Sequence, residues 1–397
     1  MKLGTFYEHQ LPRPWQEGAE LKLFKDALDQ VELADKLGID HMWEVEHHFL
    51  EEYAHSSAPE IFLAAASQRT KQIRLGHGIV LLPPGYNHPA RVAERIATLD
   101  LVSGGRVEFG TGESSAELEL GGFRIPRADK REMWQESLGA IARMFVEDPF
   151  QGHEGKYFSM PVRNVVPKPA QKPHPPLWVA CSRRETIHLA AKLGIGALTF
   201  AFVSPEEART WVNDYYTTLE NECEPIGYAV NANIAIVTGF MCDQNAELAH
   251  KMGEEGLKFF SYALGHHYAF GKHEPGKTNI WNNFKASPFT LPGMDGANSC
   301  VGSPDEIRTR LREFEEAGVD QVVFISQAGN NKHEDICSSL NLFAEKVLPE
   351  FKEREPKRAH QKAERIAPIL EKAMKRKPEP KIPKHDGPTV VQAGMLV

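Results

Sequence analysis

The feature that most constrains the fold is the alternation of short apolar runs with amphipathic stretches along the first 350 residues. Each run is rich in β-branched and aromatic residues, as buried parallel strands are, and each is followed by a helix-spaced segment. The expected strands are residues 3–7, 39–45, 73–82, 107–111, 177–180, 197–203, 233–240 and 321–326. The expected helices are residues 20–37, 59–69, 89–101, 130–145, 185–193, 205–222, 245–264, 304–317 and 334–350.

Eight such units fit closure into a (β/α)8 barrel, an α/β fold in which helices cover a parallel sheet. A doubly wound open sheet is the alternative. That fold would need a glycine-rich phosphate turn after an early strand, and the first junction, Tyr-Glu-His-Gln-Leu-Pro at residues 7–12, has none. The sequence therefore predicts a TIM barrel.

Three segments fall outside the alternation. The proline-rich stretch 152–176, after strand four, predicts an insertion in which residues 156–160 and 163–166 form a hairpin. A second insertion, residues 265–300 after strand seven, is rich in aromatic side chains and is expected to be a lid over the barrel mouth or an arm that contacts another subunit. Residues 352–397 form a proline-rich tail, expected to be partly helical or disordered, with one short helix within 364–377. The predicted barrel domain thus covers residues 1–351.

Charge is distributed unevenly between these two parts. The tail holds 12 Lys and Arg against 6 Asp and Glu, a net charge of +6, whereas residues 1–351 hold 34 against 48, a net charge of −14. An acidic body of this kind argues against a nucleic-acid-binding protein. We therefore expect the tail to pack on an acidic surface of the barrel rather than to act as a nucleic-acid arm.

Cysteine usage and hydropathy favour a cytoplasmic enzyme. No apolar stretch approaches the roughly 20 residues that a membrane-spanning helix needs, and the first residues lack the pattern of a secretory signal. The five cysteines lie far apart without a CxxC pair, which is typical of reduced thiols and not of a disulfide framework. They are Cys181, Cys223, Cys242, Cys300 and Cys337.

The carboxyl ends of barrel strands carry the active site, so the residues there are the candidates for chemistry. Strand two ends in Glu46, His47 and His48. Neighbouring residues on a strand point to opposite faces, and no partner ligands follow at metal-binding spacing, so we expect no metal. Two interpretations remain: a structural histidine beside Glu44 or Glu46, and a single working histidine that faces the barrel mouth.

Two segments at neighbouring strand ends favour a phosphate. Residues 179–185, Val-Ala-Cys-Ser-Arg-Arg-Glu, run from a strand into a helix, where free N–H groups, the Ser182 hydroxyl and the charges of Arg183 and Arg184 suit an anion. Residues 110–115, Gly-Thr-Gly-Glu-Ser-Ser, offer further donors. Each segment alone is equally an ordinary turn. Together they predict one phosphate-bearing cofactor across strands four and five.

Five ordered motifs over about 350 residues resemble the bacterial luciferase-like flavin monooxygenases. They are Glu-His-His-Phe at 46–49, Asn-His-Pro-Ala-Arg at 87–91, Leu-Asp-Leu-Val-Ser-Gly-Gly-Arg-Val at 99–107, Pro-Pro-Leu-Trp-Val-Ala at 175–180 and Val-Gly-Ser-Pro-Asp-Glu at 301–306. The resemblance implies a two-component monooxygenase that uses reduced FMN (FMNH2) and O2 to oxygenate a small organic substrate through a flavin hydroperoxide. It also implies a separate NAD(P)H-dependent flavin reductase that supplies the FMNH2, and a homodimer or dimer of dimers.

Members of the same superfamily use the deazaflavin F420, so an F420-dependent oxidoreductase on the same barrel is one alternative. A flavin-binding protein without catalysis is another.

The resemblance also implies roles for particular residues. His47 matches the family's catalytic histidine, which stands near the flavin and transfers protons, and His48 supports it. Gly78 and Ile79 match the position at which the family packs a cis peptide against the flavin ring. The expected cofactor-binding residues are Gly78, Ile79, Ser114, Ala180, Cys181, Ser182 and Arg184.

The chain departs from the family pattern after strand four, where Glu113 replaces a basic residue. Its charge would repel a phosphate. We expect Arg183 or Arg184 to supply the missing positive charge, and Glu113 to face the substrate or a partner.

Overall fold

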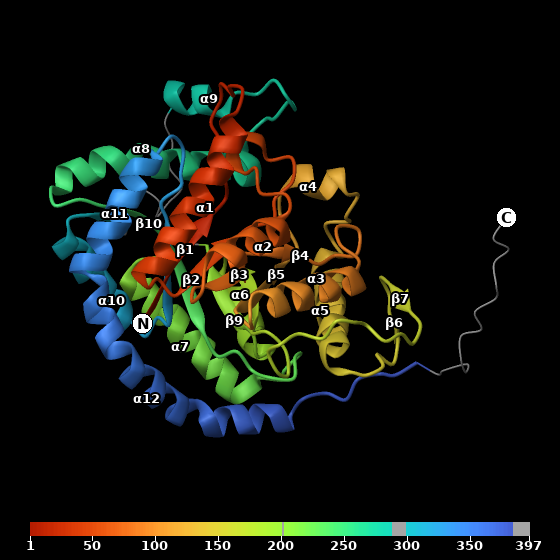
Figure 1. Ribbon diagram of the computed structural model, residues 1–397. Helices are drawn as coiled ribbons and strands as arrows, with labels where there is room; N and C mark the ends of the chain where they lie inside the picture. The colour runs from red at the N-terminus through yellow and green to blue at the C-terminus, as the bar shows by residue number, and fades with distance from the viewer. Residues whose placement is uncertain (201, 288–298, 384–397) are drawn as a thin grey trace.

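Eight parallel strands close into a barrel in the computed structural model, which describes residues 1–200, 202–287 and 299–383 (Figure 1). Around the barrel, each strand pairs with the next in the order β12-β1-β2-β3-β5-β8-β9-β10, and β10 pairs with β12 to close the ring. The strands are β1 (Lys2–Tyr7), β2 (His41–Glu44), β3 (Arg74–His77), β5 (Val107–Gly112), β8 (Leu177–Cys181), β9 (Gly196–Thr199), β10 (Ile234–Cys242) and β12 (Gln321–Ile325). The predicted (β/α)8 barrel is confirmed.

Two short strands extend the ring. β4 (Val80–Leu81) follows β3 and pairs with β5, and β11 (Cys300–Gly302) pairs with the end of β10.

The helices surround the barrel close to their predicted bounds. They are α1 (Ala19–Leu37), α2 (Pro59–Arg69), α3 (Pro89–Val102), α5 (Lys130–Val146), α6 (Arg184–Lys192), α7 (Pro205–Glu222), α8 (Ala246–Gly265), α10 (Pro304–Glu316) and α11 (His333–Lys346). Four of them begin with proline, which lacks only a donor that a first turn cannot use. Ser204 and Ser303 accept backbone N–H groups at the starts of α7 and α10, as side-chain caps.

The barrel interior is packed with aromatic side chains at mid-height. Trp43 and Trp178 meet edge to face with ring centroids 5.3 Å apart. Glycines on neighbouring strands make room for them, because a Cβ on Gly76 would lie 2.3 Å from the Trp43 ring and one on Gly196 would lie 2.4 Å from the Trp178 ring. The interior is therefore filled at this level, and a ligand has room only nearer the strand ends.

The first insertion forms a hairpin, but with a pairing that differs from the prediction. β6 (His153–Glu154) pairs antiparallel with β7 (Ser159–Met160), and Arg163 bridges to Phe150 instead. Glu136 of α5 explains this difference, since its carboxylate accepts the backbone N–H groups of residues 156–158 at 3.0–3.2 Å. That contact makes 155–158 the turn, so residues 156–160 fold back on β6.

The described part of the second insertion covers the upper edge of the barrel, beside α8 at the top of Figure 1. It contains the π-helical turn η2 (His266–Phe270) and α9 (Ile280–Ala286). Trp281 and Phe284 of α9 pack against Phe259 of α8, with ring centroids 4.9 and 5.7 Å apart. Residues 288–298, which also belong to the predicted insertion, lie outside the described residues.

Three short helical elements near the mouth were not expected. Besides η2, they are the 3-10 turn η1 (Glu51–Tyr53) and the helix α4 (Glu117–Gly122). Tyr53 of η1 and Glu119 of α4 belong to the candidate site described below, and Tyr268 of η2 lies next to it.

The start of the tail is a long helix, α12 (Leu348–Lys375), which curves around the base of the barrel in Figure 1. The predicted helix was much shorter, and the expected boundary at residue 351 falls inside α12. The helix continues through Pro356 and Pro368 because ion pairs fasten it to the barrel. Lys352 lies 2.6 Å from Asp40, and Lys362 lies 2.7 Å from Asp320.

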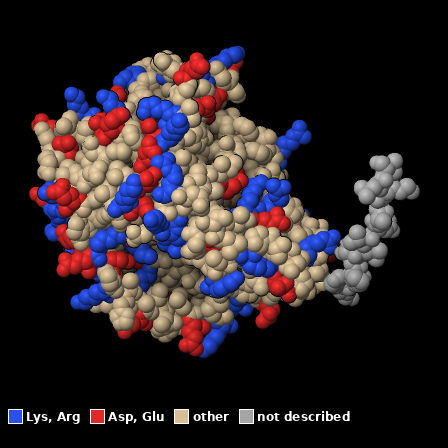
Figure 2. Space-filling model, in the orientation of Figure 1, with Lys and Arg blue, Asp and Glu red and all other residues tan. Residues whose placement is uncertain are grey.

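Basic and acidic side chains intermingle on the face shown in Figure 2. Many are paired, as in the contacts of Lys36 with Glu32 within α1 and of Arg69 on α2 with Asp29 on α1, both at 2.6 Å. None of the described helices combines the length and the apolar character needed to cross a lipid bilayer.

Candidate active site

His47 lies just beyond β2, between two buried carboxylates. Its Nδ1 is 2.9 Å from Oε1 of Glu119 on α4, and its Nε2 is 3.6 Å from Oε2 of Glu8, which directly follows β1. The His47 side chain is 15% exposed, whereas those of Glu119 and Glu8 are 0% and 2% exposed. The imidazole is thus the solvent-accessible member of a buried acidic group at the barrel mouth.

The electrostatics of this group favour a protonated imidazole. Burial disfavours the imidazolium, but the negative charges of Glu119 and Glu8 outweigh burial and raise the pKa of His47 to about 9. Burial also raises the pKa of Glu8 to about 7, against the opposing effect of His47. Near neutral pH the site therefore combines a cationic donor with a carboxyl group that can take up or release a proton.

Neighbouring groups fix both carboxylates. Glu119 accepts the backbone N–H of His48 at 2.9 Å and the hydroxyl of Ser114. Tyr53 of η1 donates its hydroxyl to Oε1 of Glu8 at 2.9 Å. These contacts hold the charges that set the protonation state of His47.

His48 points to a different carboxylate. Its Nε2 lies 3.1 Å from Oε1 of Glu46, whose Oε2 accepts the backbone N–H of Leu81 at 2.8 Å. Asn87, from the Asn-His-Pro-Ala-Arg motif, also donates to Glu46 at 2.9 Å. The side chains of the two adjacent histidines therefore point to different carboxylates. His48 contacts Glu46, which links the end of β2 to the backbone of β4.

The junction between β3 and β4 places Gly78 and Ile79 beside the mouth. The N–H of Gly78 donates to the carbonyl of Glu44 at 2.7 Å, and the Ile79 side chain lies over Gly112, where a Cβ would come within 2.6 Å of it. The expected cis bond between Gly78 and Ile79 is wrong for this structure, because every cis peptide bond of the described residues precedes proline. The trans form is the default, favoured by about 3 kcal/mol when the second residue is not proline.

The segment after β8 exposes some of the predicted cofactor residues and buries one. Ala180 is partly exposed, and Ser182 and Arg183 are exposed directly before α6. The Cys181 side chain is fully buried, and burial raises the pKa of its thiol, so only its backbone can meet a ligand. Arg184 forms an ion pair with Asp214 of α7.

Glu113 faces α5, and not a substrate side or a partner as expected. Arg131 binds both of its carboxylate oxygens, at 2.8 and 2.9 Å, and Lys130 approaches Oε1 at 2.9 Å. Two cations thus offset one anion next to the end of β5. Positive charge near the proposed phosphate position was expected from Arg183 or Arg184. Lys130 and Arg131 of α5 are a second source of positive charge, which was not expected.

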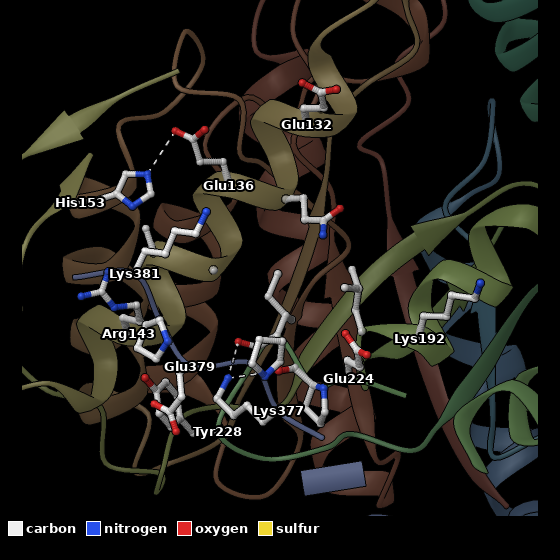
Figure 3. Close-up of a pocket in the computed structure, with 18 of the residues that line it drawn as sticks. Glu132, Glu136, Arg143, His153, Lys192, Glu224, Tyr228, Lys377, Glu379 and Lys381 are labelled. Atoms are coloured by element: carbon white, nitrogen blue, oxygen red, sulfur yellow. Dashed lines mark hydrogen bonds and ion pairs between the residues drawn. The ribbon is translucent and has the colours of Figure 1, made fainter. Parts of the chain in front are cut away.

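A separate cavity of about 1200 Å³ lies between α5, α6 and the residues that follow α12 (Figure 3). The cavity is lined by side chains of both charges. The acidic ones include Glu132, Glu136 and Glu224, and the basic ones include Arg143, Lys192 and Lys377. None of the predicted catalytic or cofactor-binding residues lines it. It is distinct from the site at His47.

Two monooxygenases are similar in sequence to this chain along most of its length. The flavin-dependent trigonelline monooxygenase, oxygenase component, of Acinetobacter baylyi is 24% identical over 363 residues, which cover 88% of this chain and 96% of that protein. Limonene 1,2-monooxygenase of Rhodococcus erythropolis is 28% identical over 356 residues, or 85% of this chain and 84% of that protein.

Solved structures share the fold along the whole barrel. Monooxygenase RslO1 from Streptomyces bottropensis superposes with a TM-score of 0.72 at 25% identity and covers 88% of this chain and 100% of its own. The oxygenating constituent of 3,6-diketocamphane monooxygenase from Pseudomonas putida, in complex with FMN, has a TM-score of 0.69 at 21% identity, with 88% and 98% covered. An F420-dependent secondary alcohol dehydrogenase has a TM-score of 0.67 at 19% identity, with 87% and 98% covered.

Of these solved structures, the diketocamphane monooxygenase is in complex with FMN and the alcohol dehydrogenase is in complex with an F420–acetone adduct. The model of the family described as luciferase-like monooxygenase matches residues 1–321, from the first strand to the start of the last. The match includes the His47 group and the segments around Glu113 and Ser182. The chain belongs to the luciferase-like monooxygenase family, whose relatives named above include flavin-dependent monooxygenases.

Proposed function

We propose that this chain is the oxygenase component of a two-component monooxygenase that uses reduced FMN and O2 to oxygenate a small organic substrate. A separate NAD(P)H-dependent flavin reductase would supply the reduced FMN, as the name of the trigonelline relative suggests. In the overall reaction, reduced FMN contributes two electrons and two protons to O2. One oxygen atom enters the product and the other leaves as water, with oxidised FMN released.

The observation that carries the proposal is the position of His47 between the buried carboxylates of Glu8 and Glu119 at the strand ends, where their charges raise the pKa of its imidazole. A cationic donor there can hold a proton next to oxygen without releasing it to solvent. Glu8, whose pKa lies near 7, can return the proton to His47 after each turnover. The Tyr53 hydroxyl keeps Glu8 in position for that exchange.

The residues near the mouth also suit an FMN molecule. Gly78 and Ile79 would lie along the ring system, and the backbone of Ala180 and Cys181 would border it. Ser114 would act indirectly, because its hydroxyl donates to Glu119 and so helps to hold the carboxylate that contacts His47.

The phosphate would bind at Ser182 and the free N–H groups that open α6. Arg183, Arg184, Lys130 and Arg131 would supply positive charge. Arg184 is paired with Asp214 and Arg131 with Glu113, so each of these ion pairs would reduce the positive charge that its arginine offers to a phosphate.

The shared fold of F420-dependent enzymes supports a second candidate, an F420-dependent oxidoreductase that does not use oxygen. Titration of the oxygen-free protein with photoreduced FMN and, separately, with reduced F420 distinguishes the two candidates. We expect micromolar or tighter binding of reduced FMN. Tight binding of reduced F420 alone would favour the second candidate, and binding of neither would overturn both.

The role of His47 is tested by His47→Ala with His250→Ala as the control, because His250 is exposed on α8. Both proteins are mixed with reduced FMN, a candidate substrate and ¹⁸O₂. We expect His47→Ala to bind FMN but to release hydrogen peroxide in place of labelled product, whereas the control keeps the product yield. Equal yields in both variants would contradict the assignment and would favour a protein that binds flavin without catalysis.

We also propose a homodimer. Ile61 on α2 and Leu101 and Val102 on α3 are 69%, 46% and 51% exposed on neighbouring helices. Ile61 lies in the first turn of α2 and Leu101 and Val102 lie in the last turn of α3, so an interface along this pair of helices would bury all three. Light scattering after size-exclusion chromatography should give twice the mass of one chain, and Ile61→Lys should reduce it.

A further inference from the structure

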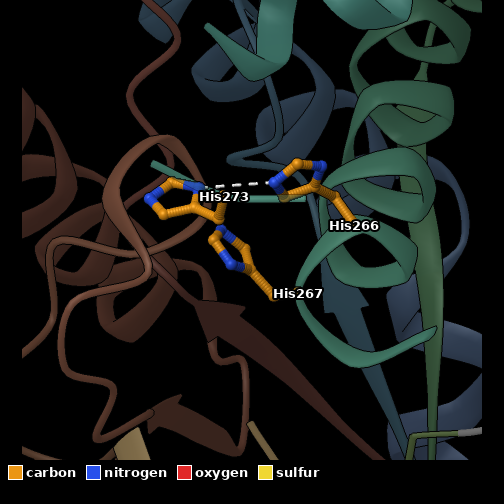
Figure 4. Close-up of side chains that lie close together, drawn as sticks. All are labelled: His266, His267 and His273. Carbon is orange, nitrogen blue, oxygen red and sulfur yellow. Dashed lines mark hydrogen bonds between the residues drawn. The ribbon is translucent and has the colours of Figure 1, made fainter. Parts of the chain in front are cut away.

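Three histidines outside the His47 group lie close together beside the barrel mouth (Figure 4). His266 and His267 belong to η2, and His273 belongs to the loop that follows. One ring nitrogen from each lies within 4.8 Å of the others. Nε2 of His266 and Nδ1 of His273 are 3.3 Å apart.

This spacing agrees with the geometry of a tetrahedral metal. Imidazole nitrogens bind zinc at about 2.0–2.1 Å, so two of them at the tetrahedral angle lie about 3.3–3.4 Å apart. The pair formed by His266 and His273 already has that separation. His267 needs only a modest side-chain movement toward them, because its nitrogen is within 4.8 Å of both.

A carboxylate stands behind one of the histidines, as is usual in metal sites. Nε2 of His273 lies 3.3 Å from Oε1 of Glu51 in η1. Glu51 is itself held by Arg13 at 2.8 Å and by the backbone N–H of Gly276 at 2.7 Å. A proton on Nε2 directed at Glu51 leaves the lone pair of Nδ1 pointing toward His266, which is the tautomer a metal requires.

His267 has few polar partners for a buried imidazole. Among the described residues its ring meets only the backbone of Leu50, and neither buried ring nitrogen forms a hydrogen bond of good geometry. Buried polar atoms are nearly always satisfied in native proteins, so an unsatisfied ring beside two other imidazoles indicates a missing partner. A metal ion would satisfy all three rings at once.

We propose that His266, His267 and His273 bind a divalent transition metal, zinc in the first instance. Three neutral imidazoles with no thiolate suit Zn²⁺, which leaves a fourth position for water. Ca²⁺ and Mg²⁺ are disfavoured because they take oxygen ligands. The site lies beyond the residues assigned to the flavin, and the inference does not depend on the proposed reaction.

The metal would hold together three segments that border the barrel mouth. It joins the π-helical turn to the loop of residues 271–279, and Glu51 joins both to η1. Tyr53 of η1 and Tyr268 of η2 both stand next to His47, with ring centroids 5.6 and 6.4 Å from it. Metal binding would therefore fix the positions of Tyr53 and Tyr268 next to His47.

Cobalt is the probe for the test, because Co²⁺ occupies zinc sites and absorbs visible light according to its coordination. The full chain, freed of metal with a chelator, is titrated with Co²⁺ and then with Zn²⁺. We expect one equivalent per chain to give the intense visible bands of four-coordinate cobalt, and Zn²⁺ to abolish them. Absence of these bands in the wild-type chain would overturn the proposal.

Variants locate the metal. His267→Ala and His273→Gln should each lose the bands, whereas His360→Ala, a change at an exposed histidine of α12, should keep them. Glu51→Gln should keep the bands but weaken affinity about 10- to 100-fold. Circular dichroism spectra establish that each variant is folded. Zn²⁺ should raise the melting temperature of the wild type and of His360→Ala, should raise that of Glu51→Gln less, and should leave those of His267→Ala and His273→Gln unchanged. Bands that persist in folded His267→Ala and His273→Gln would place the metal elsewhere and refute the assignment.

Discussion

The protonation state of His47 depends most on Glu119, and the isosteric change Glu119→Gln tests that dependence. Glutamine keeps an oxygen at the Oε1 position for the His48 N–H and places its NH2 group next to the Ser114 hydroxyl, while it removes the negative charge 2.9 Å from Nδ1 of His47. Of the interactions that raise the pKa of His47, the charge of Glu119 is the largest. Without it, burial is opposed chiefly by Glu8.

The expected effect follows from the size of the pKa shift. The rise from 6.5 to about 9 corresponds to roughly 3 kcal/mol in favour of the imidazolium. A single opposite charge in contact typically contributes 1–3 pKa units, so we expect Glu119→Gln to lower the pKa of His47 to about 7.5. At pH 8 the protonated fraction would then fall from about 90% to about 25%.

Glu119→Gln should also lower the free energy of unfolding. Because the pKa of His47 is higher in the folded state, protonation of His47 stabilises the fold fully below about pH 6.5, and this stabilisation disappears as the pH rises through about 9. Glu119→Gln should therefore cost most near neutral pH and little above pH 9. Urea unfolding at several pH values measures this dependence.

The assay is a histidine titration by NMR with ¹³C-labelled imidazoles. The chain has 17 histidines, so the His47 signal is assigned by its loss in His47→Ala. Glu20→Gln is the matched control, because Glu20 contacts His55 at 2.9 Å and is exposed. If His47 in Glu119→Gln still titrates near pH 9, the carboxylate does not hold the proton and the proposed role of the group is refuted.

Three other changes test separate parts of the structure. Glu113→Gln removes an anion beside the proposed phosphate position and frees Lys130 and Arg131, so calorimetry should show roughly 3- to 10-fold tighter FMN binding; weaker binding would contradict that position. The carboxylate of Asp35 accepts three backbone N–H groups just before β3, and these hydrogen bonds lower its pKa despite the opposing effect of burial. The stability that the ionised carboxylate provides should therefore be lost as the pH falls below about 4. Asp35→Asn should cost about 1–2 kcal/mol at pH 7 in urea unfolding, and an unchanged midpoint would refute this. Arg376 donates to the carbonyls of residues 221 and 223 at the end of α7, so Arg376→Ala should cost about 1 kcal/mol without altering flavin affinity.

Local signals explain why the barrel was predictable from sequence. Prolines and serines at helix starts and apolar strand runs act over a few residues, and the structure follows them closely. The hairpin and α12 depended on distant partners. Glu136 selects the turn of the hairpin, and Asp40 and Asp320 hold a helix that its prolines alone would interrupt. No local pattern carries that information.

The site was predictable to a similar extent. The family motif located His47, whereas Glu8 stood within the first strand–helix junction and was given no role. Glu119 was missed because α4 has only six residues, too few for a helical pattern to be visible. The partners of Glu113 were missed because charge pairing between a strand end and a later helix depends on the packed fold. The histidines of residues 266–273 were interpreted only as part of an aromatic insertion.

The closure of the ring between its first and last strands has a consequence for biosynthesis. Lys2 pairs with Gln321, so one edge of β1 stays unpaired until nearly the whole barrel has left the ribosome. An early strand with a free edge invites pairing with other nascent chains, so chaperones that bind emerging polypeptides should improve the yield. Circular permutation that makes β12 and β1 adjacent in the chain would let β1 pair early, and the last pairing of the closed ring would move to the strands at the new chain ends.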